Sequence, residues 1–428
     1  MTAIFWFRRD LRLEDNTALC QALRQHKNVV PLFIFDTHIL DELPRNDARV
    51  TFIHQRLAHL HRQLQQAGSG LVVKQGKPLA VWQSLLADYH PDAVYFNADY
   101  EPYARQRDQD LEQMLLKNKV ACRRYKDQVI FEPHEVLKPD GSCYTVFTPY
   151  KNKWLQAFQR IQLPDPTPLA TQHLTKRQSR FPTLAEIGFS PSALEVREPN
   201  LSNLHEYDAT RNIPHLDSGS YLSVHLRFGT VSIREMVKKV YPPYPTFLNE
   251  LIWREFFMQT LYHAPRVVHE NFRTKYNGIP WRNNEQEFAR WCRGETGFPM
   301  VDAGMRQLNQ TGYMHNRVRM ITAGFLCKHL LIDWRWGEAY FAEKLLDYEL
   351  ASNNGNWQWA AGTGCDAAPY FRVFNPETQQ KKFDPGQDYI RQWIPEINSP
   401  GYPAPMVDHK KARTRAIDTY KKGILSLQ

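Results

Sequence analysis

The sequence predicts a chain of two parts, an N-terminal α/β domain with a doubly wound parallel sheet and a C-terminal domain built only of helices. Strand and helix patterns alternate through residues 1–125, as in a parallel sheet with crossover helices. After about residue 206 the strand patterns mostly stop, and apolar residues recur at every third or fourth position. The 428 residues are enough for two or three domains, each with its own core.

The α/β domain, expected at residues 1–125, rests on five short apolar runs. Strands of a parallel sheet are almost continuously apolar because helices cover both faces. The predicted strands are Ala3–Phe7, Val29–Phe35, Leu71–Lys74, Ala93–Asn97 and Val120–Tyr125. The segments between them have helical spacing, as in Thr51–Gln66. Such a sheet binds ligands beyond the carboxyl ends of its strands, but no glycine-rich nucleotide motif follows the first strand.

Residues 126–205 are expected to form a connector with short helical pieces, because nine of the 28 prolines fall there. Residues 206–428 are the predicted helical domain, which also holds eight of the 11 tryptophans. Its helical patterns are Tyr244–Tyr262, Glu285–Arg293, Pro299–Asn309, His315–Leu331 and Trp336–Asp347.

Apolar runs and cysteines exclude several classes of protein. The longest runs, such as Val29–Phe35, are far shorter than the ~20 residues of a membrane-spanning helix, and the N-terminus lacks the charge order of a secretory signal. The six cysteines are far apart and form no CxxC pair, which favours a reducing compartment and argues against a zinc or iron–sulfur site. No metal site is expected, and His54, His59 and His61 are expected on a solvated helix. The net charge of +9 weakly indicates a polyanionic partner.

Two segments of the helical half carry groups that suit a polar ligand. Gly219–Ser223 precedes an apolar helix start, and its hydroxyls and backbone N–H groups could hold a phosphate, with an ordinary helix cap as the alternative. In the second segment Glu250, Trp253 and Arg254 share one helix face. That face could grip a flat polar ligand, and the alternative is a surface ion pair beside a core tryptophan.

Two further segments complete the pattern. In Met314–Met320, Arg317 could meet a phosphate, whereas Arg319 would turn inward and need a carboxylate, for which Asp347 is the candidate. The segment Asp347–Trp359 is rich in amides and tryptophan and is poor core material. Together the four segments predict a deep aromatic and polar pocket. Because no metal or nucleophile motif is present, its chemistry would come from an organic cofactor.

These segments resemble the signatures of the photolyase/cryptochrome family. The matching runs are Phe7–Asn16, Glu250–Phe256, Gly312–Met320, Asn353–Ala361 and Asp366–Pro376. They span nearly the whole chain in the family's order, and the most similar subclass is the bacterial class I photolyase for cyclobutane pyrimidine dimers. The resemblance implies FAD in the helical domain and light-driven DNA repair. In that reaction excited FADH⁻ gives an electron to a flipped-out dimer, the dimer splits, and the electron returns. The alternative is a blue-light photoreceptor (cryptochrome) without repair activity.

The resemblance assigns roles to single residues. Those implied to bind the cofactor are Tyr207, Ser220, Leu222, Ser223, Arg319, Asp347, Glu349 and Asn353. Those implied to act in repair are Glu250, Trp253, Trp359 and Asn353, the last beside flavin N5. Those implied to contact DNA are Arg211, Glu250, Trp253, Asn316, Arg317, Met320, Trp359 and Gln379. Trp281, Trp334 and Trp357 match an electron relay to the flavin, and core packing is the alternative for each.

The resemblance also sets expectations about partners and a second chromophore. The partner is UV-damaged DNA that contains cyclobutane dimers, bound by a monomer in the cytoplasm, at the nucleoid of a bacterium. An antenna near Asn97 and Glu101 could be a folate, a deazaflavin or a flavin, or be absent. The Cys-Lys pair of some folate-binding members is missing near Arg266–His269. The turn at Gly219 also lacks one hydroxyl that members commonly offer to FAD.

Overall fold

The computed structural model describes residues 2–165 and 169–426, which form two compact units. Unit 1 contains Met1–Val136, Lys153–Glu198 and Leu222–Leu248, and unit 2 contains Leu137–Asn152, Pro199–Tyr221 and Asn249–Gln428. This division differs from the predicted one, because residues 126–205 are shared between the units and residues 222–248 join the α/β unit. No helix among the described residues is long and apolar enough to cross a membrane.

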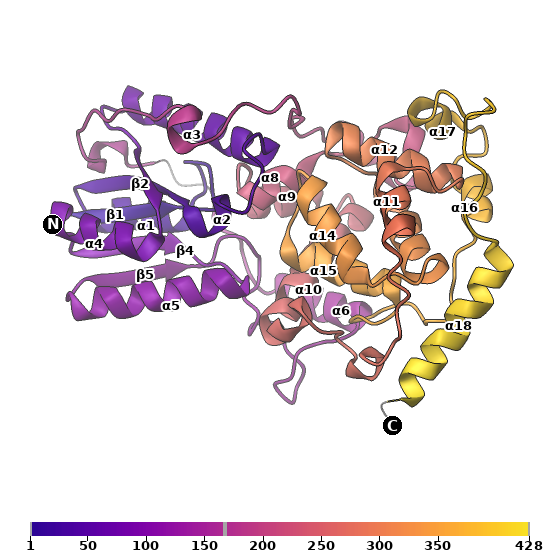
Figure 1. Ribbon diagram of the computed structural model, residues 1–428. Helices are drawn as coiled ribbons and strands as arrows, with labels where there is room; N and C mark the ends of the chain where they lie inside the picture. Colours follow the sequence, from indigo (N-terminus) through magenta and orange to yellow (C-terminus); the bar gives the residue numbers. More distant parts are fainter. Residues whose placement is uncertain (1, 166–168, 427–428) are drawn as a thin grey trace. The chain divides into compact units, whose positions relative to one another are not determined.

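Unit 1 is built on the predicted parallel sheet (Figure 1). The strands are β1 (Ala3–Phe7), β2 (Val29–Asp36), β3 (Val72–Gly76), β4 (Ala93–Asn97) and β5 (Ala121–Tyr125), in the order β3-β2-β1-β4-β5. All four pairings are parallel, with Trp6 opposite Leu32 in one register. The strand order reverses between β1 and β4, so the doubly wound sheet predicted from the sequence is confirmed.

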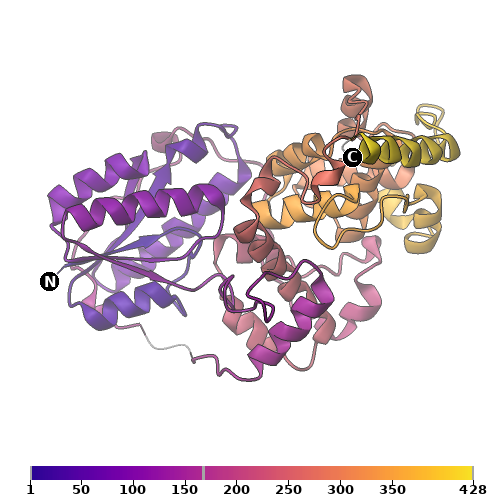
Figure 2. The ribbon, with the colours of Figure 1, turned by 90° about the horizontal axis from the view of Figure 1, so that it is seen from below.

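Helices cover both faces of this sheet, because right-handed crossovers that run in opposite directions across the sheet place their helices on opposite faces. They are α1 (Thr17–Gln25), α2 (Thr37–Leu40), α3 (Ala48–Gln66), α4 (Pro78–Tyr89) and α5 (Pro102–Lys117). Helices α4 and α5 run side by side over one face (Figure 2). There Trp82 and Leu111 pack with Trp6 of β1 in one apolar core cluster. On α3 the expectation of three solvated histidines is wrong at His61, which is buried and accepts the backbone N–H of Leu71 at 3.1 Å.

Two helices after residue 221 belong to unit 1, namely α8 (Leu222–Phe228) and α9 (Ile233–Val240). A buried ion cluster explains their place: Arg234 of α9 pairs with Asp15 at 3.0 Å and with Asp127 at 2.8 Å. Arg12 also pairs with Asp127, at 2.7 Å. Gly229, at φ +63°, lies against the backbone of residues 9 and 10, where a side chain would not fit. An amphipathic pattern shows that a helix has an apolar face but not what that face packs on, so the sequence placed α8 and α9 in the wrong unit.

Unit 2 contains only helices and loops among its described residues. Its helices are α7 (Tyr207–Thr210), α11 (Glu285–Arg293), α12 (Pro299–Thr311), α13 (Asn316–Gly324), α14 (Trp334–Lys344), α15 (Leu350–Ala361), α16 (Pro376–Phe383), α17 (Asp388–Trp393) and α18 (His409–Leu425). Two longer helices, α6 (Phe147–Phe158) and α10 (Pro245–His263), have residues in both units. Short 3-10 turns lie at Thr171–His173, Ala185–Ile187, Leu204–Glu206, Pro214–Leu216 (η4), Pro265–Val268 and Thr274–Tyr276. The core of unit 2 gathers α11 to α15 around Trp291, Trp334 and Trp357.

The helix predicted over His315–Leu331 is shorter than expected. Helix α13 ends at Gly324, and Phe325–His329 continues as a π-helical turn. Helix α14 begins two residues before its predicted start, because the Asp333 side chain accepts the N–H of Arg335 and caps it. The helix predicted at Glu285–Arg293 is confirmed at both ends.

Candidate active site

Helix α10 presents the carboxylate and the indole predicted to share a face. Arg211 donates to Glu250 at 2.8 Å, and both side chains are partly exposed. The indole of Trp253 stacks on Phe147, with ring centroids 3.7 Å apart and planes 7° apart. Arg254 pairs with Glu349 at 3.3 Å. The ion pair of Glu250 thus lies on the accessible side of the helix, as a ligand-binding carboxylate requires.

Helix α15 lies directly against α10 because of a glycine. A Cβ on Gly355 would be 2.2 Å from the ring of Phe257, so only glycine allows this approach. Trp359, one turn later on α15, is half-buried, whereas Trp357 is buried. The two tryptophans therefore face different surroundings, as the sequence predicted. Trp253 and Trp359 lie on two packed helices, and neither is fully enclosed by protein.

The ion pair predicted between Arg319 and Asp347 is present. The Nη2 of Arg319 lies 3.0 Å from an Asp347 carboxylate oxygen, and its Nε donates to the carbonyl of Met314 at 2.8 Å. The Arg319 side chain is 27% exposed and that of Asp347 is 8% exposed. The pair joins α13 to the start of the segment that leads into α15, and the guanidinium stays open on one side.

Asn353 is held by a residue that the sequence analysis missed, Glu338 of α14. The Asn353 Nδ2 donates to the Glu338 carboxyl at 2.9 Å and to the Glu338 backbone carbonyl at 3.1 Å. Burial raises the pKa of Glu338 above its ordinary value. Both N–H bonds of the amide are therefore used, and its Oδ1 has no protein partner within residues 2–165 and 169–426. The two residues are 15 positions apart on different helices, and no local motif signals their pairing.

Arg317 is more engaged than expected for a residue that reaches for phosphate. Its guanidinium donates to the Asn212 side chain at 2.6 Å and lies 4.4 Å from the centre of the Phe383 ring. His315 caps α13 by accepting the N–H of Arg317 at 3.1 Å. Burial and the nearby charges of Arg317 and Arg319 lower the pKa of His315 to about 4, so its ring is neutral at pH 7.

The other residues expected at the DNA surface are accessible. Asn316 is exposed at the start of α13, and Met320 is half-buried, with its sulfur 3.6 Å from Arg317. Gln379 is half-buried on α16.

The turn expected to hold a phosphate falls at a unit boundary. Tyr207 and Ser220 belong to unit 2, whereas Leu222 and Ser223 begin α8 in unit 1. Tyr221 between them adopts φ +53°, and the Ser220 carbonyl accepts the N–H of Asn200 at 2.8 Å. Burial and the Glu250 charge raise the pKa of Tyr207 to about 12.

The three tryptophans expected to form an electron relay range from buried to half-buried. Trp357 and Trp334 are 2% and 1% exposed, and Trp281 is half-buried. The ring of Trp357 contacts Trp291, with centroids 6.1 Å apart, and Trp334 donates its indole N–H to Asn271 at 2.8 Å. All three pack into or against the same core cluster of unit 2.

In unit 1 the carboxyl ends of the strands hold a dense set of paired charges. Asn97 is buried and donates to Asp10 at 2.6 Å and to Asn16 at 2.8 Å. Glu101 pairs with Arg9 at 3.0 Å and with Arg227 at 3.1 Å. Both residues expected near an antenna are therefore already bound to protein groups.

The donors and acceptors left over in unit 2 fit the flavin ring of FAD. A flavin edge offers carbonyl oxygens and, when reduced, an N–H at N5. Arg319 keeps donors beyond those it gives to Asp347 and Met314, and Asn353 keeps an acceptor. Reduced FAD would supply an electron on absorbing light, the kind of chemistry that these side chains lack on their own.

Comparisons with known proteins show the family to which the chain is similar. Residues 3–170 match the family described as DNA photolyase, and residues 247–401 match the FAD binding domain of DNA photolyase. The chain is 36% identical to the deoxyribodipyrimidine photo-lyase of Halobacterium salinarum, over 98% of this chain and 99% of that protein. The Escherichia coli deoxyribodipyrimidine photo-lyase is 35% identical and covers 98% of each chain.

Solved structures of photolyases and of a cryptochrome have a similar fold. A class III photolyase from Agrobacterium tumefaciens superimposes with a TM-score of 0.89 at 34% identity, over 99% of this chain and 97% of that one. An archaeal photolyase from Sulfolobus tokodaii, solved with two FAD molecules, has a TM-score of 0.87 at 36% identity, over 99% and 100% of the two chains. A Synechocystis cryptochrome shares the fold, with a TM-score of 0.85 at 24% identity, over 98% of this chain and 99% of that one.

Proposed function

Since the chain belongs to the photolyase family, we propose that it is a light-dependent deoxyribodipyrimidine photo-lyase that repairs cyclobutane pyrimidine dimers in DNA with FAD as its cofactor. The observation that carries the proposal is the accessible face of α10, where Glu250 and Trp253 stand together beside α15. A carboxylate next to a flat indole suits a flipped-out pyrimidine dimer, which offers N–H edges and apolar ring faces. A photoreceptor without repair activity has no need of this combination.

Each residue of this face has a defined task. Glu250 accepts hydrogen bonds from the base edges of the dimer, and Arg211 orients it through their ion pair. Trp253 and Trp359 form the apolar walls. Phe147 backs Trp253 and fixes the plane of its ring. When bound, reduced FAD would supply the electron for opening the cyclobutane ring.

A second group of residues surrounds the flavin. Asn353, fixed by Glu338, presents its amide oxygen to flavin N5, where a reduced flavin carries an N–H. Arg319 contributes positive charge beside the ring, and Asp347 holds Arg319 in place. Glu349 anchors α15 to α10 through Arg254. In unit 2, Tyr207 and Ser220 bind the phosphate side of the cofactor. The family resemblance implies the same role for Leu222 and Ser223.

Outside the pocket, Asn316, Arg317, Met320 and Gln379 form the DNA contact surface. Arg317 acts through its ordered position between Asn212 and Phe383, so it contacts phosphate with little loss of side-chain freedom. Electrons can pass through three tryptophan rings, from half-buried Trp281 to the buried rings of Trp334 and Trp357. The protein acts as a monomer in the cytoplasm of a bacterial cell, and its antenna is a second flavin, a folate or a deazaflavin, or is absent.

The proposal is tested with an oligonucleotide that contains one cyclobutane dimer. Purified protein with reduced FAD is mixed with it, and one sample is kept in the dark while the other receives blue light. Loss of the dimer only in the light is expected. If the dimer persists under illumination although the flavin stays reduced, the protein is a photoreceptor and not a repair enzyme. An oligonucleotide with a 6-4 photoproduct is the matched substrate control and should remain unchanged.

A further inference from the structure

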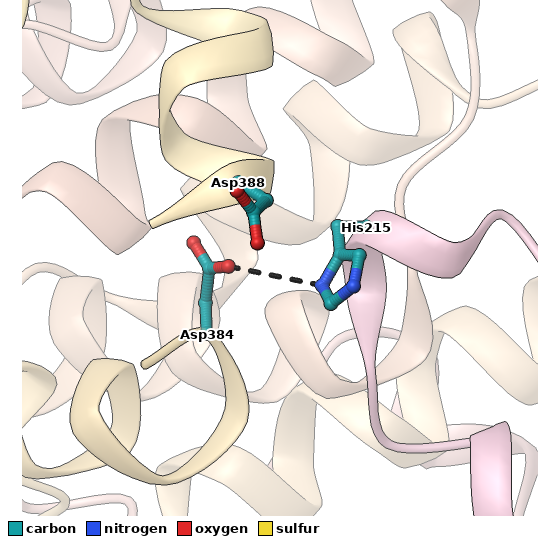
Figure 3. Close-up of side chains that lie close together, drawn as sticks. All are labelled: His215, Asp384 and Asp388. Atoms are coloured by element: carbon teal, nitrogen blue, oxygen red, sulfur yellow. Dashed lines mark ion pairs between the residues drawn. The ribbon is translucent and has the colours of Figure 1, made fainter. Parts of the chain in front are cut away.

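Three side chains of unit 2 converge outside the proposed active site: His215 of η4, Asp384 after α16, and Asp388 at the start of α17 (Figure 3). One donor atom from each, the imidazole nitrogen and two carboxylate oxygens, lies within 4.8 Å of the other two. Gln387 turns the chain through φ +58°, and Asp388 then returns toward Asp384. No metal site was expected from the sequence. The three residues follow no ligand motif, and they are separated by up to 173 positions.

The imidazole nitrogen that faces the two carboxylates has no hydrogen bond. His215 Nδ1 is shielded from solvent and has no hydrogen-bond partner among the described residues, and its distance to Asp384 Oδ1 is 3.9 Å. A hydrogen bond between these atoms would require about 2.7–3.2 Å. The distance is therefore too long for a hydrogen bond between His215 and Asp384. A buried nitrogen without a partner costs free energy that a bound cation would recover.

The two aspartates approach each other with little positive charge nearby among the described residues. Asp384 is completely buried and accepts the backbone N–H groups of Tyr389 and Ile390, both to its carboxylate. Asp388 is exposed, and Arg391 lies 3.7 Å from it on the solvent side. Two carboxylates beside each other repel unless positive charge lies between them. His215 is the nearest group inside the cluster, and its free nitrogen is aimed at the same point (Figure 3).

We propose that His215, Asp384 and Asp388 form a binding site for a divalent transition-metal ion of the zinc type. One imidazole and two carboxylates are a ligand set that Zn²⁺ accepts, with water in the remaining position. Mg²⁺ is disfavoured because it prefers an all-oxygen shell. Ligand atoms of a tetrahedral zinc site are about 3.4 Å apart, so small side-chain movements from the present spacing would complete it.

The ion has a structural role. It ties η4 to the chain at the end of α16 and the start of α17. Arg211 lies four residues before His215, and Gln379 lies five residues before Asp384. Binding would stabilise the folded protein, since the unfolded chain does not hold the three ligands together. The metal site is independent of the proposed repair activity, and it can be tested by measuring metal binding alone.

The test uses full-length, untagged protein with FAD, freed of metal by a chelator and then dialysed. Calorimetric titration with ZnCl₂ is expected to show one saturable site, and MgCl₂ is expected to bind at least ten times more weakly. In His215→Ala and in Asp388→Asn, zinc affinity should fall by at least about tenfold. Asp384 is left unchanged, because it also caps the backbone of the next helix. The control is His269→Ala, which removes an exposed histidine outside the cluster and should bind zinc like the wild type.

A second measurement distinguishes a site from loose surface binding. Zinc should raise the melting temperature of the wild type and of His269→Ala, but not of His215→Ala or Asp388→Asn. The proposal is overturned if zinc does not bind saturably, if His215→Ala binds it with unchanged affinity, or if Mg²⁺ binds as tightly as Zn²⁺. Equal loss of zinc binding in the His269→Ala control would also overturn it.

Discussion

Replacing Trp253 with alanine is the sharpest test of the lesion pocket. The indole is held flat by Phe147, whose ring centroid lies 3.7 Å away with planes 7° apart. The indole is only partly buried, so its accessible part can stack on a base, and such stacking contributes about 1–3 kcal/mol per base. Since about 1.4 kcal/mol is a factor of ten, Trp253→Ala should weaken binding of dimer-containing DNA about 5- to 150-fold.

The loss should be selective for damaged DNA. Contacts to phosphate dominate the affinity for undamaged DNA and its salt dependence, and the substitution removes no charge. Binding is measured by fluorescence anisotropy with matched damaged and undamaged oligonucleotides at several salt concentrations. The ratio of the two affinities should fall while the salt slope stays the same. Trp253→Phe should keep most of the ratio, because a phenyl ring still stacks.

A matched control is Trp336→Ala. Trp336 is also half-buried, but it packs on Phe288 of α11 and has no proposed contact with DNA. Its removal should lower stability without changing the affinity ratio. An unchanged ratio in Trp253→Ala, or an equal decrease in Trp336→Ala, would refute the assignment of Trp253 to the lesion pocket.

Three other predictions follow from the geometry of single residues. Trp281→Phe should slow the light-driven reduction of oxidised flavin, while repair from chemically reduced flavin continues. An equal rate of flavin photoreduction in Trp281→Phe and in the wild type would contradict the relay. Glu338→Ala should release the Asn353 amide, at about 1 kcal/mol for the lost hydrogen bond, and speed air oxidation of the bound reduced flavin about fivefold, whereas Glu338→Gln should not. In unit 1, burial alone would raise the pKa of Asp127, but the positive charges of Arg12 and Arg234 hold this pKa below its ordinary value. Its stabilising contribution is therefore present above the unfolded-state pKa near 4 and is lost as the pH falls further. Asp127→Asn, which removes the carboxylate that Arg12 and Arg234 share, should lower the unfolding free energy by about 3–5 kcal/mol at pH 7 and flatten its dependence on acid pH.

Local sequence patterns determined the elements of the fold. The strands Ala3–Phe7 and Ala93–Asn97 were predicted at both ends, because a parallel strand buried on two faces is apolar along its length. The helix at Glu285–Arg293 was equally clear, since Asn284 caps its start and Gly294 ends it. These signals act over a few residues, so the sequence shows them directly.

The contacts between elements were harder to predict. Arg319 and Asp347 were paired correctly, because a buried guanidinium needs a carboxylate and few were available. Glu338 was missed, although it holds the amide of Asn353, because nothing in its own segment distinguishes it from an exposed helix residue. The pairing of Arg211 with Glu250 was also not foreseen, even though both were expected at the DNA surface.

The sequence by itself determined the fold class, the family and the residue types of the pocket, since those depend on periodicity and on long motifs. Only the tertiary structure decided which unit holds α8 and α9, which atom of Asn353 is left for a ligand, and that His215 meets two aspartates from the other end of the helical half. Each of these depends on side chains far apart in sequence that meet through packing. The direction of a hydrogen bond or the gap between two carboxylates leaves no pattern along the chain.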